Sequence, residues 1–408
     1  MERSLTPVAP RERLLTLDVL RGFALLGVLI GNMVLYSGRW ATGPGGPPPS
    51  TLDVIASWFI SIFVDSKAQT TLTLLFGFGF AAQLLRAEQR GEPVLGVYLR
   101  RLSALLVLGA LHVTVLWWGD VTWTYAVAGF GLLAFLRCSN RALLIWGLVL
   151  SFVPYVVMLL PDAMIAAVSV FIEPRQFGAH TAEMAAAIRS APYTELPREH
   201  LVYAAIWLTR IYTWYFFWIL GRFLLGYLAG RLRWFDRDGA DHLAAFRRLA
   251  GWGGAIAAAV TAVSVAERLG ALHLEAHGWW GAIASSVLEQ IGLLALALAY
   301  VAVVVLLIQR PRWRRLLGVL APVGRMPLTT YFSQSLVCTF VFYGWGLGQA
   351  GKIGVAGTLG LALAIFSVQV AIAHLWLRWF RFGPLEWLWR TAVYLKPPPM
   401  RATAATAG

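Results

Sequence analysis

Residues 291–308 read IGLLALALAYVAVVVLLI, eighteen positions without a charged side chain. A helix of this length and character crosses the roughly 30 Å hydrocarbon core of a bilayer. Similar runs recur along the chain, so the sequence predicts an all-α fold, a polytopic transmembrane helical bundle of about ten helices. The predicted spans lie near 18–37, 67–85, 102–119, 121–136, 141–160, 204–230, 249–267, 282–308, 316–343 and 354–377. A shorter run at 52–64 is expected in the outer interface.

The composition fits lipid-facing surface. Hydrophobic residues make up 59% of the 408 positions and charged residues only 13%. A soluble domain carries about 25% charged residues, because its surface needs polar cover. The 19 tryptophans also suit membrane interfaces, where amphipathic rings sit at headgroup level.

The basic residues orient the predicted spans. If the N-terminus is cytoplasmic, the inner segments hold 23 Lys and Arg residues and the outer segments hold six. This excess places both the N- and C-termini in the cytoplasm. The net charge of +14 is thus spread over short inner clusters, which argues against nucleic acid as a partner. No cleavable signal is expected at the N-terminus. The chain is expected to lie in a membrane and to cross it several times.

The chain divides around one bundle. We expect a cytoplasmic N-terminal tail at 1–16, a transmembrane bundle at 17–395 with outer segments at 38–66 and 161–200, and a disordered cytoplasmic tail at 396–408. The two cysteines, Cys138 and Cys338, lie in or beside predicted helices, which favours neither a disulfide framework nor a metal site. Glycine-rich spans would permit a homodimer.

Polar side chains interrupt the first two spans, where they are costly and usually face a bundle interior. Asp18 and Arg21 are three residues apart and share a helix face, so they can pair as an interfacial anchor. Alternatively, Arg21 binds an anionic ligand from the cytoplasm, since guanidinium suits phosphates. Asn32 lies near the outer end of this span. Lys67 opens the second span, as a snorkelling anchor or as part of the binding site.

His112 is the strongest candidate for a general base. An imidazole on lipid-facing surface would be expensive, so it is expected to face inward, where it is suited to proton transfer near neutral pH. A purely structural buried histidine is the alternative. Asp120 follows eight residues later, which on a straight helix means about 12 Å of rise and a face offset of about 80°. A direct pair would require Gly119 to break the helix, so Asp120 could instead hold a substrate at the outer mouth or cap the next helix.

The ninth span begins with an unusual density of polar groups. The sequence GRMPLTTYFSQSL at 324–336 contains Arg325, Tyr331 and Gln334. Such a density is typical of cavity lining, although hydrogen bonding between helices would also account for it. We assign these three residues to a substrate- or cofactor-binding set together with Arg21, Asn32 and Lys67.

Several motifs together resemble those of the YeiB-like family of bacterial membrane proteins. They are LDVLRGFALLGVLIGN at 17–32, KAQTTLTLLFGFG at 67–79, RRLSALLVLGALHVTVLWWGDVTWTYAVAG at 100–129, GRMPLTTYFSQSL at 324–336, FYGWGLG at 342–348 and GPLEWLWR at 383–390. The resemblance covers nearly the whole chain, and it implies a location in the bacterial plasma (inner) membrane, multi-pass. The family carries a domain of unknown function, and it is similar to the transmembrane acyltransferases that include the acyltransferase-three and heparan glucosaminide acetyltransferase families.

The resemblance implies a bundle in which acyl-CoA enters from the cytoplasm and an acceptor from the other side. Arg21 matches the family's LRG motif. Asn32 stands where the acyltransferase-three pattern has a histidine, so the base expected there is absent. His112, within a GxxHxxxxWxGD pattern, is the candidate replacement.

Two functions compete. In the first, the chain is an acyltransferase that moves an acyl group, expected to be acetyl, from acyl-CoA to an acceptor hydroxyl or amine. His112 would deprotonate the acceptor, Arg21 and Arg325 would hold the donor, and Asn32, Gln334 or Tyr331 would stabilise the oxyanion. Direct transfer is expected, because no cysteine nucleophile is at hand. In the second, the same polar groups line the path of a transporter or exporter of a small solute.

Overall fold

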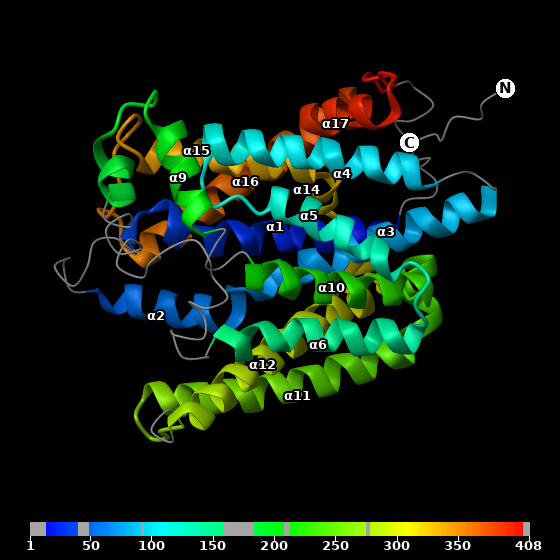
Figure 1. Ribbon diagram of the computed structural model, residues 1–408, viewed down its shortest axis with the longest axis horizontal. Coiled ribbons are helices and arrows are strands. Elements are labelled where there is room, and N and C mark those ends of the chain that lie inside the picture. Colours follow the sequence, from blue (N-terminus) through cyan, green and yellow to red (C-terminus); the bar gives the residue numbers. More distant parts are fainter. Residues whose placement is uncertain are drawn as a thin grey trace.

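The computed structural model describes residues 14–39, 49–90, 94–158, 183–207, 213–274 and 278–402. Over these ranges the chain is helical, and its one β-bridge joins Phe380 to Arg401. Figure 1 shows the long helices lying side by side along one direction. Of the predicted tails and outer segments, residues 1–13, 40–48, 161–182 and 403–408 lie outside the described residues.

Six helical segments in the described part are long and apolar enough to cross a membrane, which indicates a multi-pass membrane protein. They are α1 (Leu15–Tyr36), the run from α2 (Thr51–Phe59) through η4 (Ile60–Val64) into α3 (Lys67–Arg90), α4 (Val94–Leu111) with η5 (His112–Leu116), η8 (Asp236–His242) with α11 (Leu243–Arg268), α12 (Gly278–Ile308) and α16 (Val355–Trp379).

Shorter or broken helices cover the other four predicted spans. They are α5 (Thr122–Leu132) with η6 (Leu133–Phe135), α6 (Asn140–Met158), α9 (Leu196–Trp207) with α10 (Thr213–Arg231), and α13 (Pro311–Gly318), α14 (Ala321–Arg325) and α15 (Pro327–Phe342). Pro322 and Pro327, in the first turns of α14 and α15, explain why the predicted span 316–343 is interrupted, since proline suits a first helical turn and interrupts a helix interior.

The apolar run at 52–64, expected in the outer interface, forms α2 and η4, which lead into α3. Helix α2 packs against α16. Ser50 and Asp53 form a capping box at the start of α2. Asp53 also accepts a hydrogen bond of 2.9 Å from the backbone N–H of Ala356, which ties α2 to the first turn of α16.

Helix α1 is the centre of the bundle, in contact with α3, α14, α15 and α16. It meets α14 backbone to backbone, since a Cβ on Gly324 would lie 1.8 Å from the carbonyl oxygen of Asp18. The same close approach joins α3 to α10, where a Cβ on Gly226 would lie 1.9 Å from the carbonyl oxygen of Leu74. Small residues at such crossings are how helices pack tightly in membranes.

Helix α17 (Pro384–Tyr394) lies at one edge of the bundle against α4 (Figure 1). The chain then turns back. Trp387 Nε1 donates to the carbonyl of Pro398, and the backbone N–H of Ala402 donates to Trp379. These contacts place residues 396–402 against α16 and α17.

Candidate functional site

A break in the helix after His112 brings Asp120 back to it. Residues His112–Leu116 form a π-helical turn, and Trp117 is extended with φ −162° and ψ 126°. A Cβ on Gly119 would lie 2.5 Å from the Trp117 indole, so a larger residue would have to displace this buried ring. As a result, His112 Nδ1 lies 3.0 Å from Asp120 Oδ1. The helix break that a direct pair requires is present.

Asp120 also caps the next helix. Its Oδ2 accepts a hydrogen bond of 3.1 Å from the backbone N–H of Trp123, in the first turn of α5. The positive end of the helix dipole favours a carboxylate at this position. Asp120 thus has two of the three roles considered from the sequence, as partner of His112 and as helix cap. In these two roles, Oδ1 faces His112 and Oδ2 faces the backbone of α5.

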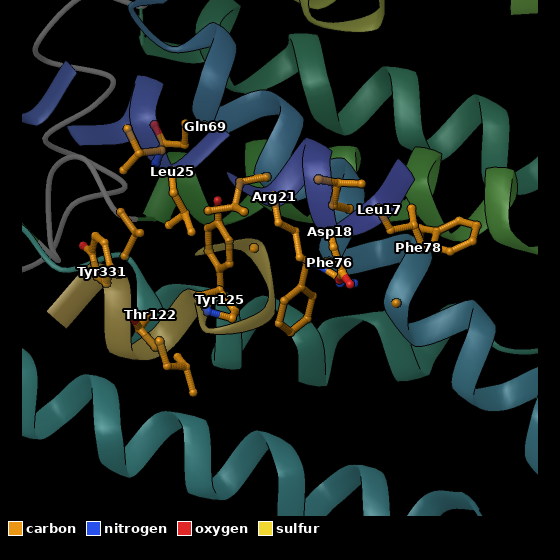
Figure 2. A pocket seen from close by; sticks show the side chains of 18 of the residues that line it. Leu17, Asp18, Arg21, Leu25, Gln69, Phe76, Phe78, Thr122, Tyr125 and Tyr331 are labelled. Carbon is orange, nitrogen blue, oxygen red and sulfur yellow. The ribbon is translucent and has the colours of Figure 1, made fainter. Parts of the chain in front are cut away.

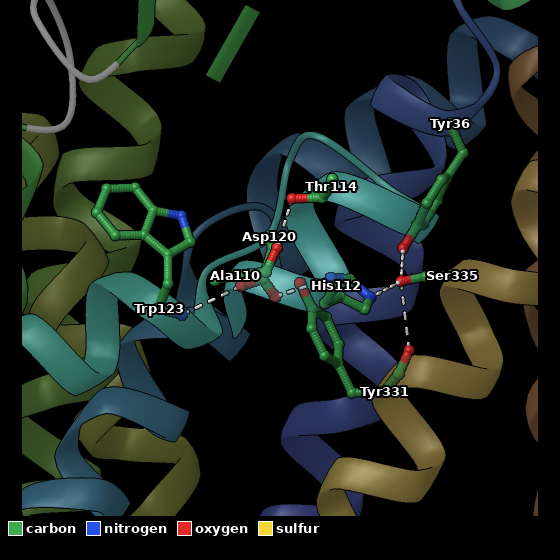
Figure 3. Close-up of polar contacts among 8 residues, drawn as sticks. All are labelled: Tyr36, Ala110, His112, Thr114, Asp120, Trp123, Tyr331 and Ser335. Carbon is green, nitrogen blue, oxygen red and sulfur yellow. Dashed lines mark hydrogen bonds and ion pairs between the residues drawn. The ribbon is translucent and has the colours of Figure 1, made fainter. Parts of the chain in front are cut away.

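Ser335 completes a chain of side chains with His112 and Asp120. Its Oγ lies 2.8 Å from His112 Nε2 and 2.7 Å from the hydroxyl of Tyr36 (Figure 3). His112 comes from the π-turn after α4, Tyr36 is the last residue of α1, and Ser335 lies in α15. Three parts of the bundle therefore meet at the Ser335 hydroxyl. Sequence reasoning missed Ser335. The signal was its spacing of four from Tyr331, which puts both on one face of α15.

The site is enclosed. The exposed fractions of His112, Asp120 and Ser335 are 1%, 0% and 0%. Aromatic rings surround it. The ring centroids of Tyr331 and Phe332 lie 5.1 Å and 4.3 Å from that of His112, and the ring centroids of Tyr36 and Trp117 are 4.1 Å apart. Charges and hydrogen bonds act more strongly in such a low-dielectric setting than in water.

Residues 183–207 cover this site from one side. His200 Nδ1 donates to the carbonyl of Thr114 at 3.1 Å, and the hydroxyl of Tyr193 donates to Val115 at 2.8 Å. The pKa of His200 is lowered to about 4, chiefly by burial and also by the nearby His112, although the bond to Thr114 opposes the shift. His200 is therefore neutral at physiological pH.

A cavity of about 1300 Å³ runs beside the site (Figure 2). Its lining follows α1 from Leu17 to Leu35, a helical length of about 27 Å. Leu25, Phe76 and Tyr125 lie along its length. Six arginines line it: Arg21, Arg101, Arg233, Arg237, Arg325 and Arg390. Asn32, Asp65 and Gln69 line it near the other end of α1. One end of the cavity is therefore strongly basic.

Tyr331 connects the cavity with the buried site. It is a lining residue, and its ring also stacks on His112. Val121 and Thr122, which directly follow Asp120, are lining residues as well. His112 and Ser335 are not among the lining residues, so they lie behind this wall.

The predicted binding residues divide into two groups. Arg21, Asn32, Arg325 and Tyr331 line the cavity. Arg21 Nη1 also pairs with Asp18 Oδ1 at 3.0 Å. Arg21 therefore forms the ion pair expected of an interfacial anchor and also lines the cavity.

Lys67 and Gln334 point elsewhere, because each finds a partner in a neighbouring segment. Lys67 Nζ donates to the carbonyl of Ser61 at 2.6 Å, which fits the anchoring alternative. Gln334 Nε2 donates to Gln369 Oε1 of α16 at 3.1 Å. Neither is a lining residue of the cavity, so the structure does not bring them to the expected site.

Glu386 is a second residue that the sequence did not single out. Its carboxylate accepts bonds from the N–H of Leu328 at 2.6 Å, the N–H of Thr329 at 3.1 Å and the Thr329 hydroxyl at 2.6 Å. Thr329 Oγ1 in turn accepts from the N–H of Leu385. The first turns of α15 and α17 therefore cap each other. Burial raises the pKa of Glu386, while the bonds from Thr329 and Leu328 oppose the rise.

The chain is similar to bacterial proteins over nearly its whole length. It is 30% identical over 430 residues to "Uncharacterized protein YxaH" of Bacillus subtilis (strain 168), covering 97% of this chain and 98% of that protein. It is 27% identical over 409 residues to "Uncharacterized protein YeiB" of Escherichia coli (strain K12), covering 93% and 96%. The family model described as "Protein of unknown function (DUF418)" matches residues 229–396, which include Ser335 and Glu386. This chain therefore belongs to the YeiB-like family.

Proposed function

We propose that this protein is an integral-membrane acyltransferase that uses cytoplasmic acyl-CoA, with acetyl-CoA as the expected donor. We further propose ten spans with both termini in the cytoplasm of a bacterium, in its inner membrane. The observation that carries the function is the buried contact chain Ser335–His112–Asp120 behind a cavity with a basic end.

His112 is the proton-accepting group in this proposal. Asp120 beside Nδ1 favours the tautomer with its proton on Nδ1, which leaves the Nε2 lone pair facing Ser335. This is the arrangement that a general base needs, with one nitrogen oriented by a carboxylate and the other facing the group that loses a proton.

The basic end of the cavity suits the phosphates of acyl-CoA. Arg21, Arg101, Arg325 and Arg390 come from α1, α4, α14 and α17, so their guanidinium groups approach the same space from several helices. Guanidinium–phosphate pairs are bidentate and strong where solvent is limited. On the positive-inside assignment, this end of the bundle faces the cytoplasm, where acyl-CoA is found.

The extended pantetheine arm would carry the thioester to the site. Arg21 and Tyr36 are fifteen residues apart on α1, which corresponds to about 22 Å. The cavity lining extends along α1 past Arg21 to Leu17 at one end and to Leu35, the neighbour of Tyr36, at the other. An acceptor would approach from the end near Asn32 and Asp65.

Export of a small solute is the second candidate, and the length of the cavity favours it. The two functions differ in what the protein releases. A transporter moves its solute without consuming acyl-CoA, whereas a transferase releases free CoA whenever an acceptor or water takes the acyl group.

The test is acyl-CoA binding and free-thiol release by the purified full-length protein in nanodiscs. We expect wild type to bind acetyl-CoA and release CoA, and His112→Ala to bind the donor but lose release by roughly a thousandfold. His374→Ala is the matched control, because this histidine is exposed and contacts the backbone carbonyl of Val319, between α13 and α14, at 3.0 Å. Absence of binding to any acyl-CoA would overturn the proposal. Equal release by wild type and His112→Ala would overturn the role of His112.

A further inference from the structure

We propose that Ser335 is a covalent nucleophile that carries the acyl group as an ester between donor and acceptor. The inference rests on the proposed acyltransferase function and adds a residue to it. It replaces direct transfer, which the sequence favoured for want of a cysteine, with a two-step route through a serine.

The direction of the hydrogen bonds follows from the neighbours. With the proton of His112 on Nδ1 beside Asp120, Nε2 can only accept. The hydrogen in the 2.8 Å contact must therefore come from the Ser335 hydroxyl. The Tyr36 hydroxyl then donates to Ser335 Oγ across 2.7 Å. Ser335 is thus poised to lose its proton to His112.

Comparison with the other membrane-helix hydroxyls sets Ser335 apart. A serine in such a helix ordinarily donates to a carbonyl three or four residues back. Ser333 does so at 2.9 Å, Ser151 at 2.6 Å and Ser367 at 2.8 Å. The corresponding distance for Ser335 is 3.4 Å, because its hydroxyl is drawn toward His112 and Tyr36.

The geometry brings a nucleophile, a base and an acid into contact. Ser335 Oγ and His112 Nε2 share a hydrogen bond of 2.8 Å. His112 Nδ1 lies 3.0 Å from Asp120 Oδ1, an ion-pair contact that is not aligned as a hydrogen bond. Tyr36 supplies a hydroxyl donor beside the attacking oxygen, where it can turn to the oxyanion that develops on the thioester carbonyl. Burial also protects an ester intermediate from water. The Tyr331 ring lies between the cavity and this centre, so it has to move aside for the thioester.

The reaction balances without any further reagent. Ser335 Oγ forms a bond to the thioester carbonyl carbon while its proton passes to His112 Nε2. The carbon–sulfur bond then breaks, and the sulfur takes the proton from Nε2 and leaves as the CoA thiol. In the second step, the acceptor hydroxyl or amine gives its proton to Nε2 and attacks the ester carbon. The bond to Ser335 Oγ breaks, and that oxygen recovers the proton.

The first test does not require a CoA substrate. Full-length protein in nanodiscs is treated with an alkyl fluorophosphonate, and peptides are mapped by mass spectrometry. We expect modification of Ser335 in wild type and a rate lower by roughly a thousandfold in His112→Ala. Ser333→Ala, two residues away on the same helix, should react like wild type. Ser335→Cys keeps the side-chain size, so loss of labelling at an unchanged thermal midpoint separates chemistry from folding.

The second test uses acetyl-CoA and an acid quench, and it distinguishes the two proposals. One acetyl group on the peptide containing Ser335, absent in Ser335→Ala, supports both. Fluorophosphonate labelling of Ser335 without CoA release leaves the nucleophile standing and refutes the acyl-CoA function. CoA release that persists in Ser335→Ala refutes the covalent route and leaves direct transfer by His112. A wild-type protein in which neither reagent modifies Ser335 overturns the inference.

Discussion

Glu386 offers a direct test of how the C-terminal helix supports the site. It lies at the start of α17 with 5% of its surface exposed, and it accepts three hydrogen bonds from Leu328 and Thr329 at the start of α15. The first N–H groups of a helix have no partner within the helix itself. Replacement by alanine leaves these donors without their acceptor inside the protein.

The expected loss can be estimated from these bonds. A hydrogen bond to a charged group contributes about 1.5–3 kcal/mol, and the three contributions overlap because they share one carboxylate. Removal of one partner from a buried charged contact costs about 3–5 kcal/mol. For Glu386→Ala we therefore expect a loss of about 3–5 kcal/mol and a thermal midpoint lower by roughly 3–10 °C.

The assay is the thermal midpoint of purified protein, followed by fluorescence-detected size exclusion. Glu386→Gln should fall between wild type and Glu386→Ala, because its amide keeps one acceptor oxygen. Glu195→Ala, at an exposed position, is the matched control and should leave the midpoint unchanged. A midpoint for Glu386→Ala equal to that of wild type would refute the reciprocal capping of α15 and α17.

Three further predictions concern other parts of the bundle. Gly226→Ala places a Cβ against the carbonyl of Leu74, so we expect a loss of about 1–3 kcal/mol in thermal stability, whereas Gly79→Ala, with open space around it, should be neutral. Burial lowers the pKa of His200 to about 4, so the unfolded chain binds a proton more readily than the folded one. Stability should therefore fall as the pH drops from about 6.5 to about 4, and His200→Gln should flatten that dependence in pH-resolved melts. Arg21→Ala should weaken acetyl-CoA binding by roughly tenfold or more in calorimetry, and unchanged affinity would remove it from the donor site.

Much of the helical framework follows from hydrophobic patterning. The apolar runs predict the helices, because a membrane-spanning backbone has to satisfy its own hydrogen bonds. The pairing of Arg21 with Asp18 follows from the spacing of three residues on one helix. These features depend only on neighbours along the chain, which a single sequence contains.

The site depends instead on a departure from helical periodicity. On a straight helix, the spacing of eight residues would separate His112 from Asp120 by about 12 Å along the axis. The π-turn and the extended Trp117 instead reverse the chain between them and bring the two side chains together. A glycine in a membrane helix is common, so Gly119 alone does not reveal a reversal. Ser335 was equally hidden, since an intramembrane serine usually bonds to its own helix. Only the packing of α15 against α1 and the π-turn brings it to His112.

The placement of the polar groups bears on the choice between transfer and transport. A solute path requires polar side chains that face the moving solute, as in the cavities of transporters. Here His112, Asp120 and Ser335 face one another behind Tyr331, while the cavity beside them is lined at midlength by Leu25 and aromatic rings. A chain of mutual contacts between an acid, an imidazole and a hydroxyl is poorly suited to coordinating a passing solute. It is well suited to moving one proton at a fixed point, which is what acyl transfer at Ser335 requires.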